Sequence, residues 1–322
     1  MTKLIVRVAI AAALLLSAGG AAWSQTYPAR PIRWIVLFPP GGGSDIVSRI
    51  LGQKLSASVG QQVVIDNRTG GSGVIGTDIV AKATPDGYTI GMIISSHLVN
   101  PALMKKLPYD SANDFAPITL IAYGLFALVV HPSVPAASLK ELVAYVRANP
   151  GKLNSPVTTG TIGHLALELF KSSYSVDIAS IPYRGAGDAV TGLLGGQVQV
   201  AFASFPSVQP FIKTGKLRAL AVTSAKRSPI APELPTAAEL GAETLVLSDW
   251  WGMVAPARTD KALVNLLNRE IVKALALPDV KERLLGLGAE IVASTPEEFA
   301  ELIRNGIPKW GKVMRDAGIK PE

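Results

Sequence analysis

The sequence has no cysteine among its 322 residues. Such a chain forms no disulfides, offers no thiolate to zinc and has no cysteine nucleophile. It also lacks a G-x-S-x-G motif, in which α/β hydrolases carry their nucleophilic serine. Only three histidines are present, and they lie on separate segments. We therefore expect no catalytic residues, no bound metal and no cofactor.

Clustered basic charge and aromatic residues are also scarce. Lys and Arg outnumber Asp and Glu by 31 to 24, but the longest basic runs are pairs such as Lys105-Lys106 and Lys226-Arg227. Aromatic residues make up 6% of the chain. Proteins that bind nucleic acids usually gather basic and aromatic residues on one face. These patterns argue against a nucleic-acid partner, although a net charge of +7 would help to attract small anions.

No apolar run is long enough to span a membrane. At the N-terminus, Lys3 and Arg7 precede nine apolar residues, Val8–Leu16, and small residues continue to Ser24. Spanning a bilayer takes ~20 apolar residues, whereas this order of charged, apolar and small residues is typical of a secretory signal. We expect residues 1–24 to be a signal peptide cleaved after Ser24. The absence of cysteine excludes a lipid anchor at that cleavage site.

From Tyr27 onward, apolar strands and amphipathic helices alternate. A strand over residues 32–38 leads to a helix over 44–58, and a strand over 153–157 leads to a helix over 164–173. This spacing predicts an α/β protein with doubly wound parallel sheets.

The order of elements also suggests two lobes. Hinge crossings near residues 122–127 and 246–252 would assign residues 25–124 plus 247–322 to lobe 1 and residues 125–246 to lobe 2. Ligands of open α/β sheets bind beyond the carboxyl ends of strands, so a cleft between the lobes is expected. Trp250-Trp251 lie at the second crossing. Adjacent strand residues point to opposite faces, so at most one of these rings should line the cleft.

The most informative stretch is a glycine-rich loop between the first strand and the first helix. It reads Phe38-Pro39-Pro40-Gly41-Gly42-Gly43-Ser44-Asp45, and Ser44 and Asp45 suit a helix N-cap. Glycine lets a ligand approach the backbone, and the free N–H groups of a helix N-terminus attract anions. A second small, hydroxyl-bearing loop, Thr158–Thr161, precedes the helix of the second lobe. We interpret the two loops as halves of a carboxylate-binding cleft, although a loop of this kind can also be only a connector.

Several stretches together resemble the Bug (TctC-like) family of extracytoplasmic solute-binding receptors of tripartite tricarboxylate transporters. The matching stretches run in order through residues 27–322: Tyr27–Ile32, Phe38–Asp45, Asp66–Arg68 with Gly70, Gly71, Gly73 and Gly76, Pro85–Thr89, Asn100-Pro101, Leu107–Asp110, Gly160-Thr161 with His164-Leu165, Pro182–Gly185, Leu194–Val198 and Trp310–Val313.

The resemblance implies a two-lobed periplasmic-binding-protein fold of the Venus-flytrap, type II-like kind, in which each lobe is a doubly wound sheet. It also implies a periplasmic, monomeric, non-enzymatic receptor that binds a small carboxylate mainly through backbone amides and presents it to membrane transporter subunits. The ligand-binding residues that we expect on this basis are Phe38, Pro40, Gly41, Gly42, Gly43, Ser44, Asp45, Ser95, His97, Thr159, Gly160, Thr161, His164, Arg184, Gly185 and Ala203.

Two departures from the family pattern bear on the ligand. Where relatives often read Gly-Thr-Ser-Ser-His, this chain has Gly160-Thr161-Ile162-Gly163-His164, which removes side-chain donors. Where many relatives carry an acidic or amide residue after a phenylalanine, Ala203 follows Phe202. An acid there could pair with a ligand ammonium group, so its absence favours a ligand without an amine.

Other interpretations remain open from the sequence. Gly71–Gly76 matches the G-x-G-x-x-G dinucleotide motif, but no acidic residue ends the next strand to hold a ribose. His164 and Glu168 share a helix face, yet zinc needs a third protein ligand. Arg184 could contact a second ligand carboxylate or be solvated. An exported α/β enzyme acting on a carboxylate or ester, and a ligand-sensing partner of a signalling protein, are the alternative functions.

Overall fold

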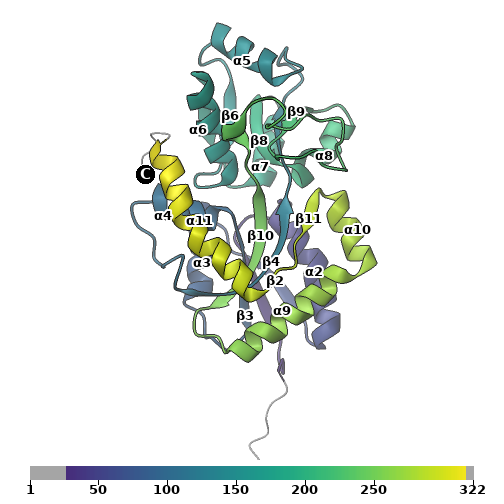
Figure 1. Ribbon diagram of the computed structural model, residues 1–322. Coiled ribbons are helices and arrows are strands. Elements are labelled where there is room, and N and C mark those ends of the chain that lie inside the picture. Colours follow the sequence, from purple (N-terminus) through teal and green to yellow (C-terminus); the bar gives the residue numbers. More distant parts are fainter. Residues whose placement is uncertain (1–26, 317–322) are drawn as a thin grey trace, which may run out of the picture.

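The computed structural model describes residues 27–316, so the predicted signal peptide lies outside the described residues. Two lobes stand one above the other (Figure 1). We call lobe 1 the part that is built on a six-stranded sheet, and lobe 2 the part that contains a three-stranded and a two-stranded sheet. Within residues 27–316, no helix has the length and apolar character needed to cross a bilayer.

The sheet of lobe 1 is mixed rather than wholly parallel. Its strand order is β11-β4-β10-β3-β1-β2. β1 is parallel to β2 and β3, whereas β10 runs antiparallel to β3 and β4 because the chain enters β10 from lobe 2. The strands are β1 (Ile32–Val36), β2 (Val63–Asn67), β3 (Thr89–Ile94), β4 (Phe115–Gly124), β10 (Asp249–Pro256) and β11 (Ala289–Ile291).

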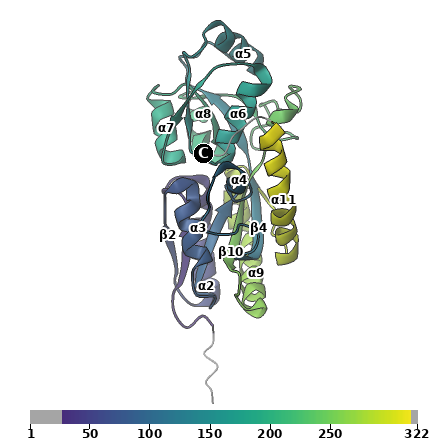
Figure 2. The same cartoon turned by 90° about the vertical axis from the view of Figure 1, so that its left-hand side faces the viewer.

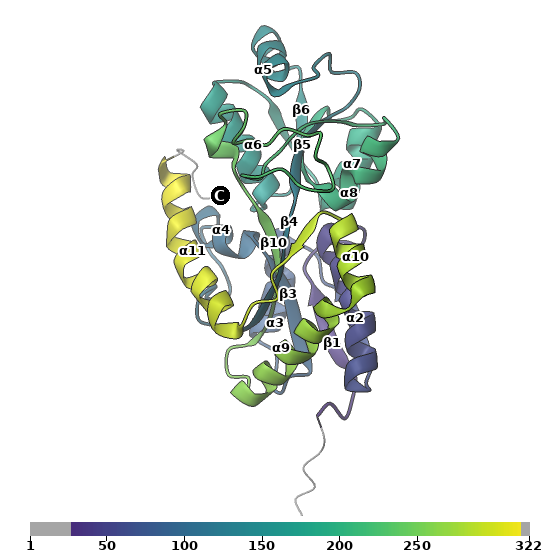
Figure 3. The ribbon, with the colours of Figure 1, turned by 45° about the vertical axis from the view of Figure 1, so that its right-hand side comes forward.

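Helices cover both faces of this sheet. Figure 3 shows α2 and α10 on one side of the strands and α4 and α11 on the other. Buried side chains from the central strands, such as Trp34 and Met253, fill the space between these layers together with Phe299 of α11. The helices of lobe 1 are α2 (Gly43–Val59), α3 (Val74–Ala81), α4 (Ser96–Leu103), α9 (Lys261–Ala276), α10 (Pro278–Gly286) and α11 (Pro296–Asp316), with a short 3₁₀ turn η1 (Gly71–Gly73).

Lobe 2 has smaller sheets flanked by helices. The strand order β8-β5-β9 is antiparallel throughout, and β6 pairs with β7 in parallel. The strands are β5 (Phe126–Val130), β6 (Asn154–Val157), β7 (Ala179–Pro182), β8 (Val200–Ser204) and β9 (Arg218–Val222). The helical elements are α5 (Leu139–Ala148), α6 (Ile162–Tyr174), α7 (Ala186–Leu194), α8 (Phe205–Lys213) and the 3₁₀ turn η2 (Glu243–Leu245).

The chain passes between the lobes along two adjacent strands. β4 leads into β5 with only Leu125 between them, and Asp249 at the start of β10 is paired with Gly124 at the end of β4. A third connection comes from packing, because Met314 of α11 belongs to the same buried cluster as Val99 of α4 and the core of lobe 2. Figure 2 shows α4 and the upper end of α11 at the level where the lobes meet.

Candidate functional site

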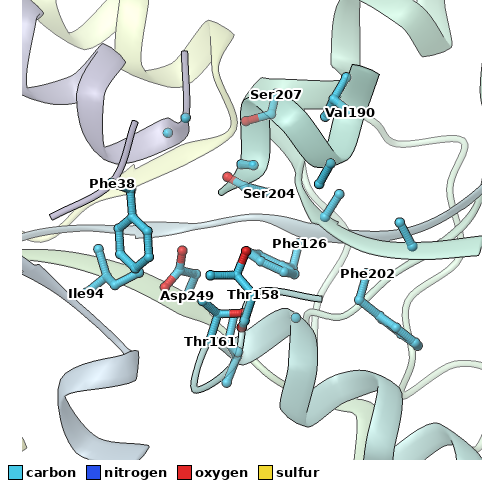
Figure 4. Close-up of a pocket in the computed structure, with 18 of the residues that line it drawn as sticks. Phe38, Ile94, Phe126, Thr158, Thr161, Val190, Phe202, Ser204, Ser207 and Asp249 are labelled. Atoms are coloured by element: carbon cyan, nitrogen blue, oxygen red, sulfur yellow. The ribbon is translucent and has the colours of Figure 1, made fainter. Parts of the chain in front are cut away.

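A cavity of about 110 Å³ lies between the lobes, and both lobes line it. Roughly 10–15 Å³ is enough for one water molecule, so the cavity has room for a small organic molecule. Figure 4 shows the labelled side chains arranged around this space. Seven of the residues expected from the sequence line it: Phe38, Gly42, Gly43, Ser44, Thr161, His164 and Ala203.

The N-terminus of α2 forms the lobe 1 side of the cavity. The N-cap is Gly42, with φ −79° and ψ 164°, and no side chain caps the helix. The expectation that Ser44 or Asp45 would be the cap is therefore wrong, because both lie inside the first turn. First-turn N–H groups have no partner within a helix, so those of Gly43 and Ser44 are available beside the cavity.

Asp45 holds the loop instead of facing the cavity. Its Oδ2 accepts a hydrogen bond from the Gly41 N–H at 3.1 Å, and its Oδ1 accepts one from Asn67 Nδ2 at 3.1 Å. Arg49 forms an ion pair with it at 2.9 Å. Burial acts to raise the pKa of Asp45, but these hydrogen bonds outweigh burial, and the pKa lies below its usual value. Gly41 itself has φ 89°, a conformation that suits glycine.

The N-terminus of α6 faces the cavity from lobe 2. Thr161 is the N-cap, and its Oγ1 accepts a hydrogen bond from the His164 N–H at 3.4 Å while donating to the Thr158 carbonyl at 2.8 Å. This arrangement leaves the N–H groups of Ile162 and Gly163, both in the cavity wall, without an intrahelical partner. Two helix N-termini, each with a favourable dipole for anions, therefore meet at the cavity.

Gly163 explains one departure from the family pattern. A methyl group there would lie 2.7 Å from the Phe202 carbonyl oxygen and 3.3 Å from the Phe126 ring. The start of α6 thus packs closely against β8 and β5, and a serine would not fit without displacing this backbone. Ala203 also lines the cavity and leaves its wall apolar at that point.

The remaining wall of lobe 2 is largely apolar, with two buried hydroxyl groups. Phe126, Val190, Leu193 and Phe202 contribute apolar surface. Ser204 is the N-cap of α8 without a capping hydrogen bond, and the buried hydroxyl groups of Ser204 and Ser207 have no hydrogen-bond partner within the described part of the chain. Buried hydroxyl groups normally have a partner, so these two are available to a ligand.

Asp249 contributes a buried carboxyl group that the sequence did not single out. It is 5% exposed, and its Oδ1 accepts a hydrogen bond from Ser95 Oγ. Burial raises the pKa of Asp249 from its usual 3.8 to about 6, although hydrogen bonds from Ser95 and the Trp250 amide favour the charged form. The carboxyl is therefore mostly ionised at pH 7. Its position directly before Trp250-Trp251, at a predicted hinge crossing, could have identified it as a site residue from the sequence.

Trp251 connects the binding loop to the crossing strands. It lines the cavity, and a methyl group at Gly43 would lie 2.8 Å from its Cζ2 atom. A methyl group at Gly124, the last residue of β4, would meet the same ring. Trp250 instead packs edge-on against Phe299 in lobe 1, with ring centroids 5.5 Å apart. The alternation of strand side chains thus sends one ring to the cavity, as expected.

Other expected residues lie around the cavity without lining it. Gly160 and Gly185 lie where the lobes touch: a methyl group at Gly185 would be 2.7 Å from Pro39 Cδ, and one at Gly160 would meet the Asn100 side chain. The two lobes are therefore in direct contact at both of these points. Pro40, Gly41, Thr159 and Arg184 are also outside the lining, and Arg184 is exposed.

Two further expected residues are buried within lobe 1. Ser95 reaches the cavity only through its hydrogen bond to Asp249. His97 is 2% exposed, its Nε2 lies 2.8 Å from the Ser111 carbonyl oxygen, and its ring packs against Tyr109 and Phe115. Burial lowers the pKa of His97 to about 4. Its surroundings give it a place in the core of lobe 1.

The family model described as "Tripartite tricarboxylate transporter family receptor" matches residues 47–319. The chain belongs to this family. BugT of Bordetella pertussis is 40% identical over 325 residues, which cover 99% of this chain and 99% of BugT. The periplasmic binding protein BugD is 33% identical, with a TM-score of 0.89, and the match covers 92% of this chain and 100% of BugD. The R. palustris protein Rpa4515, whose structure contains adipate, is 34% identical with a TM-score of 0.89 over 92% of this chain and 100% of that protein.

Family membership settles the class of protein. The two-lobed architecture is that of the periplasmic binding proteins, as the resemblance implied. The chain is an extracytoplasmic solute-binding receptor of a system that works with transporter subunits, and not an enzyme. Among residues 27–316, no group of three or more His, Asp or Glu side chains is placed to hold a metal ion.

Proposed function

We propose that the receptor captures one small organic carboxylate between its lobes in the periplasm, after export through residues 1–24, and delivers it as a monomer to its membrane transporter. The observation that carries this proposal is the meeting of the α2 and α6 N-termini at one cavity, to whose lining residues 27–316 contribute no Lys or Arg. A carboxylate is the anion that such backbone donors suit. The adipate in the structure of Rpa4515 supports the same ligand class.

The two helix N-termini would hold the carboxylate group. The N–H groups of Gly43 and Ser44 would donate from lobe 1, and those of Ile162 and Gly163 from lobe 2. Hydrogen bonds to a charged group contribute about 1.5–3 kcal/mol each, and they strengthen where water is excluded. Because the donors belong to different lobes, the anion stabilises the closed arrangement over an open one.

The lobes would move about the two crossing strands. We assign residues 25–124 plus 247–322 to lobe 1 and residues 125–246 to lobe 2, with the hinge near residues 122–127 and 246–252. The direct passage from β4 into β5 supports these boundaries. Hinge closure around a ligand is the usual motion of such receptors.

A thermal-shift screen of aliphatic and aromatic carboxylates tests the proposal. A ligand at 100 times its Kd adds about 2.7 kcal/mol to the free energy of unfolding, so at least one acid should raise the Tm. Mass spectrometry of the recovered acid should show it unchanged. A screen in which no carboxylate stabilises the protein, or in which the stabilising acid is turned over, would refute the proposed function.

A variant with a matched control locates the site. Gly42→Val would place methyl groups toward Ala186, whose Cβ lies 3.7 Å from the position of a new Cβ, and so obstruct the contact between the lobes. The φ of −79° at Gly42 is accessible to valine, so the protein should still fold. Gly286→Val, in open space on α10, is the control. The ligand-induced shift in Tm should vanish in the first variant and persist in the second.

A further inference from the structure

The charges in the cavity are unusual for a site that receives an anion. Asp249 and His164 are the only titratable side chains among the described residues that line it. Asp249 is buried at the start of β10, and His164 lies in the first turn of α6, where its Nδ1 accepts a hydrogen bond from the Gly160 N–H at 3.4 Å. The backbone donors of α2 and α6 can neutralise one carboxylate. A second carboxylate would have no Lys or Arg to pair with and would share the cavity with Asp249.

The rest of the cavity accommodates an apolar body. Phe38 and Ile94 from lobe 1 line the cavity together with Phe126, Val190 and Phe202 from lobe 2, and Figure 4 shows Phe38 and Ile94 on one side of the space and Phe126 on the other. Removing a charged group from water into such surroundings without a partner costs several kcal/mol. Apolar surface, in contrast, gains about 25 cal/mol for each Å² that is buried. The wall therefore favours carbon over a second anionic group.

Two polar groups in the cavity wall, Asp249 and Ser204, favour a ligand whose apolar part carries one polar substituent. The Asp249 carboxylate already receives hydrogen bonds from the Ser95 hydroxyl and from the backbone amides of Ser95 and Trp250, and a carboxylate has about four acceptor positions. It can accept another donor from the cavity. Independently, Ser204 is 8% exposed and its hydroxyl has no partner among the residues that the structure describes. A ligand with no polar group besides its carboxylate would leave both groups buried beside carbon.

We infer that the ligand is a monocarboxylate with an apolar body and one hydrogen-bond donor, a hydroxyl or an ammonium group, that reaches Asp249. The inference rests on the proposed function, and it names the acids that the receptor selects. Asp249 acts as the selecting group: it accepts from the donor and repels a second carboxylate. The expectation of a ligand without an amine, which rested on Ala203, loses its basis because Asp249 supplies an acid elsewhere in the cavity.

Titration calorimetry with acids of one carbon skeleton tests the inference. The probes are hexanoate, 2-hydroxyhexanoate, 6-hydroxyhexanoate, 6-aminohexanoate and adipate, at pH 7.5. At least one hydroxy or amino acid should bind about tenfold more tightly than hexanoate, which corresponds to 1.4 kcal/mol. Adipate should bind more weakly than hexanoate. The hydroxy and amino probes distinguish the two kinds of donor.

The variant Asp249→Asn separates this role from a structural one. It keeps the shape of the side chain but removes its charge, so the advantage of the donor should shrink and the penalty on adipate should largely disappear. Glu301→Gln, an exposed site on α11, is the control and should keep the wild-type ranking. If adipate matches or exceeds the hydroxy and amino acids in the wild type, or if Asp249→Asn leaves the ranking unchanged, this inference is wrong while the receptor function stands. If the thermal screen finds no stabilising carboxylate at all, the proposed function itself fails.

Discussion

Replacing Asp249 by asparagine should change how the stability of the protein depends on pH. The folded-state pKa of Asp249 is raised by burial to about 6, against 3.8 for the unfolded chain. Below pH 3.8 the group is protonated in both states and has no effect. As the pH rises through 6, the native state is forced to hold a buried charge, and stability is lost. One pKa unit corresponds to about 1.4 kcal/mol, so the full cost above pH 7 is about 3 kcal/mol.

The measurement is a pair of urea denaturation series for the wild type and Asp249→Asn without ligand. Groups far from Asp249 contribute equally to both proteins, so their contributions cancel in the difference. At pH 4.5 Asp249 is mostly protonated in the folded wild type, so most of the free-energy cost of its buried charge is absent. The free energy of unfolding of Asp249→Asn minus that of the wild type should therefore be about 2 kcal/mol larger at pH 7.5 than at pH 4.5.

Only the change with pH is diagnostic, since the new amide also alters the hydrogen bonds with Ser95 and Trp250 by an amount that does not depend on pH. Glu301→Gln should give a flat difference over the same range. A flat difference for Asp249→Asn would mean that its carboxyl is not desolvated in the folded protein. It would also remove the electrostatic basis for the selection of monocarboxylates.

Three further predictions concern the core and the closing contacts. Gly43→Ala should displace the ring of Trp251, whose Cζ2 atom would lie 2.8 Å from the new methyl group. We expect the free energy of unfolding to fall by about 1–3 kcal/mol, as at other overpacked sites. Carboxylates that raise the Tm of the wild type should not raise the Tm of this variant. His97→Gln should make the protein less sensitive to acid. Burial lowers the pKa of His97 from 6.5 to about 4, so the wild type loses about 3 kcal/mol of stability as the pH falls through that range. Equal acid sensitivity of the two proteins in urea titrations would contradict this. Gly160→Ala should lower the free energy of unfolding by about 1–2 kcal/mol, because alanine is strained at the φ of 77°. It should also increase the radius of gyration in X-ray scattering, since the new methyl group would meet the Asn100 side chain of the other lobe. An unchanged radius would show that this contact does not limit closure.

The parts of the site that depend on short-range signals could be predicted from the sequence. The loop that ends at Ser44 follows an apolar strand and precedes an amphipathic helix, so its position at a helix N-terminus could be predicted. The same holds for Thr161, which is the N-cap of α6. Both loops line the cavity because each follows the carboxyl end of a strand, where open α/β sheets place their ligands.

The remaining features depend on contacts between distant parts of the chain. Ser95 and Asp249 are 154 positions apart, and nothing local shows that they share a hydrogen bond. The antiparallel direction of β10 follows from the return of the chain out of lobe 2 and not from any residue in the strand. The family resemblance implied that His97 lies in the cleft. The turn into α4 points it into the core instead, where Tyr109 and Phe115 enclose it.

The indole of Trp251 has a mechanical consequence. One rigid ring touches the start of α2 at Gly43 and the end of β4 at Gly124, while its own backbone lies in the neighbouring strand. These contacts hold the first turn of α2 against the two strands that cross between the lobes. Bending of these strands at Trp251 therefore acts on the first turn of α2, so the geometry of the hinge and that of the binding turn depend on each other.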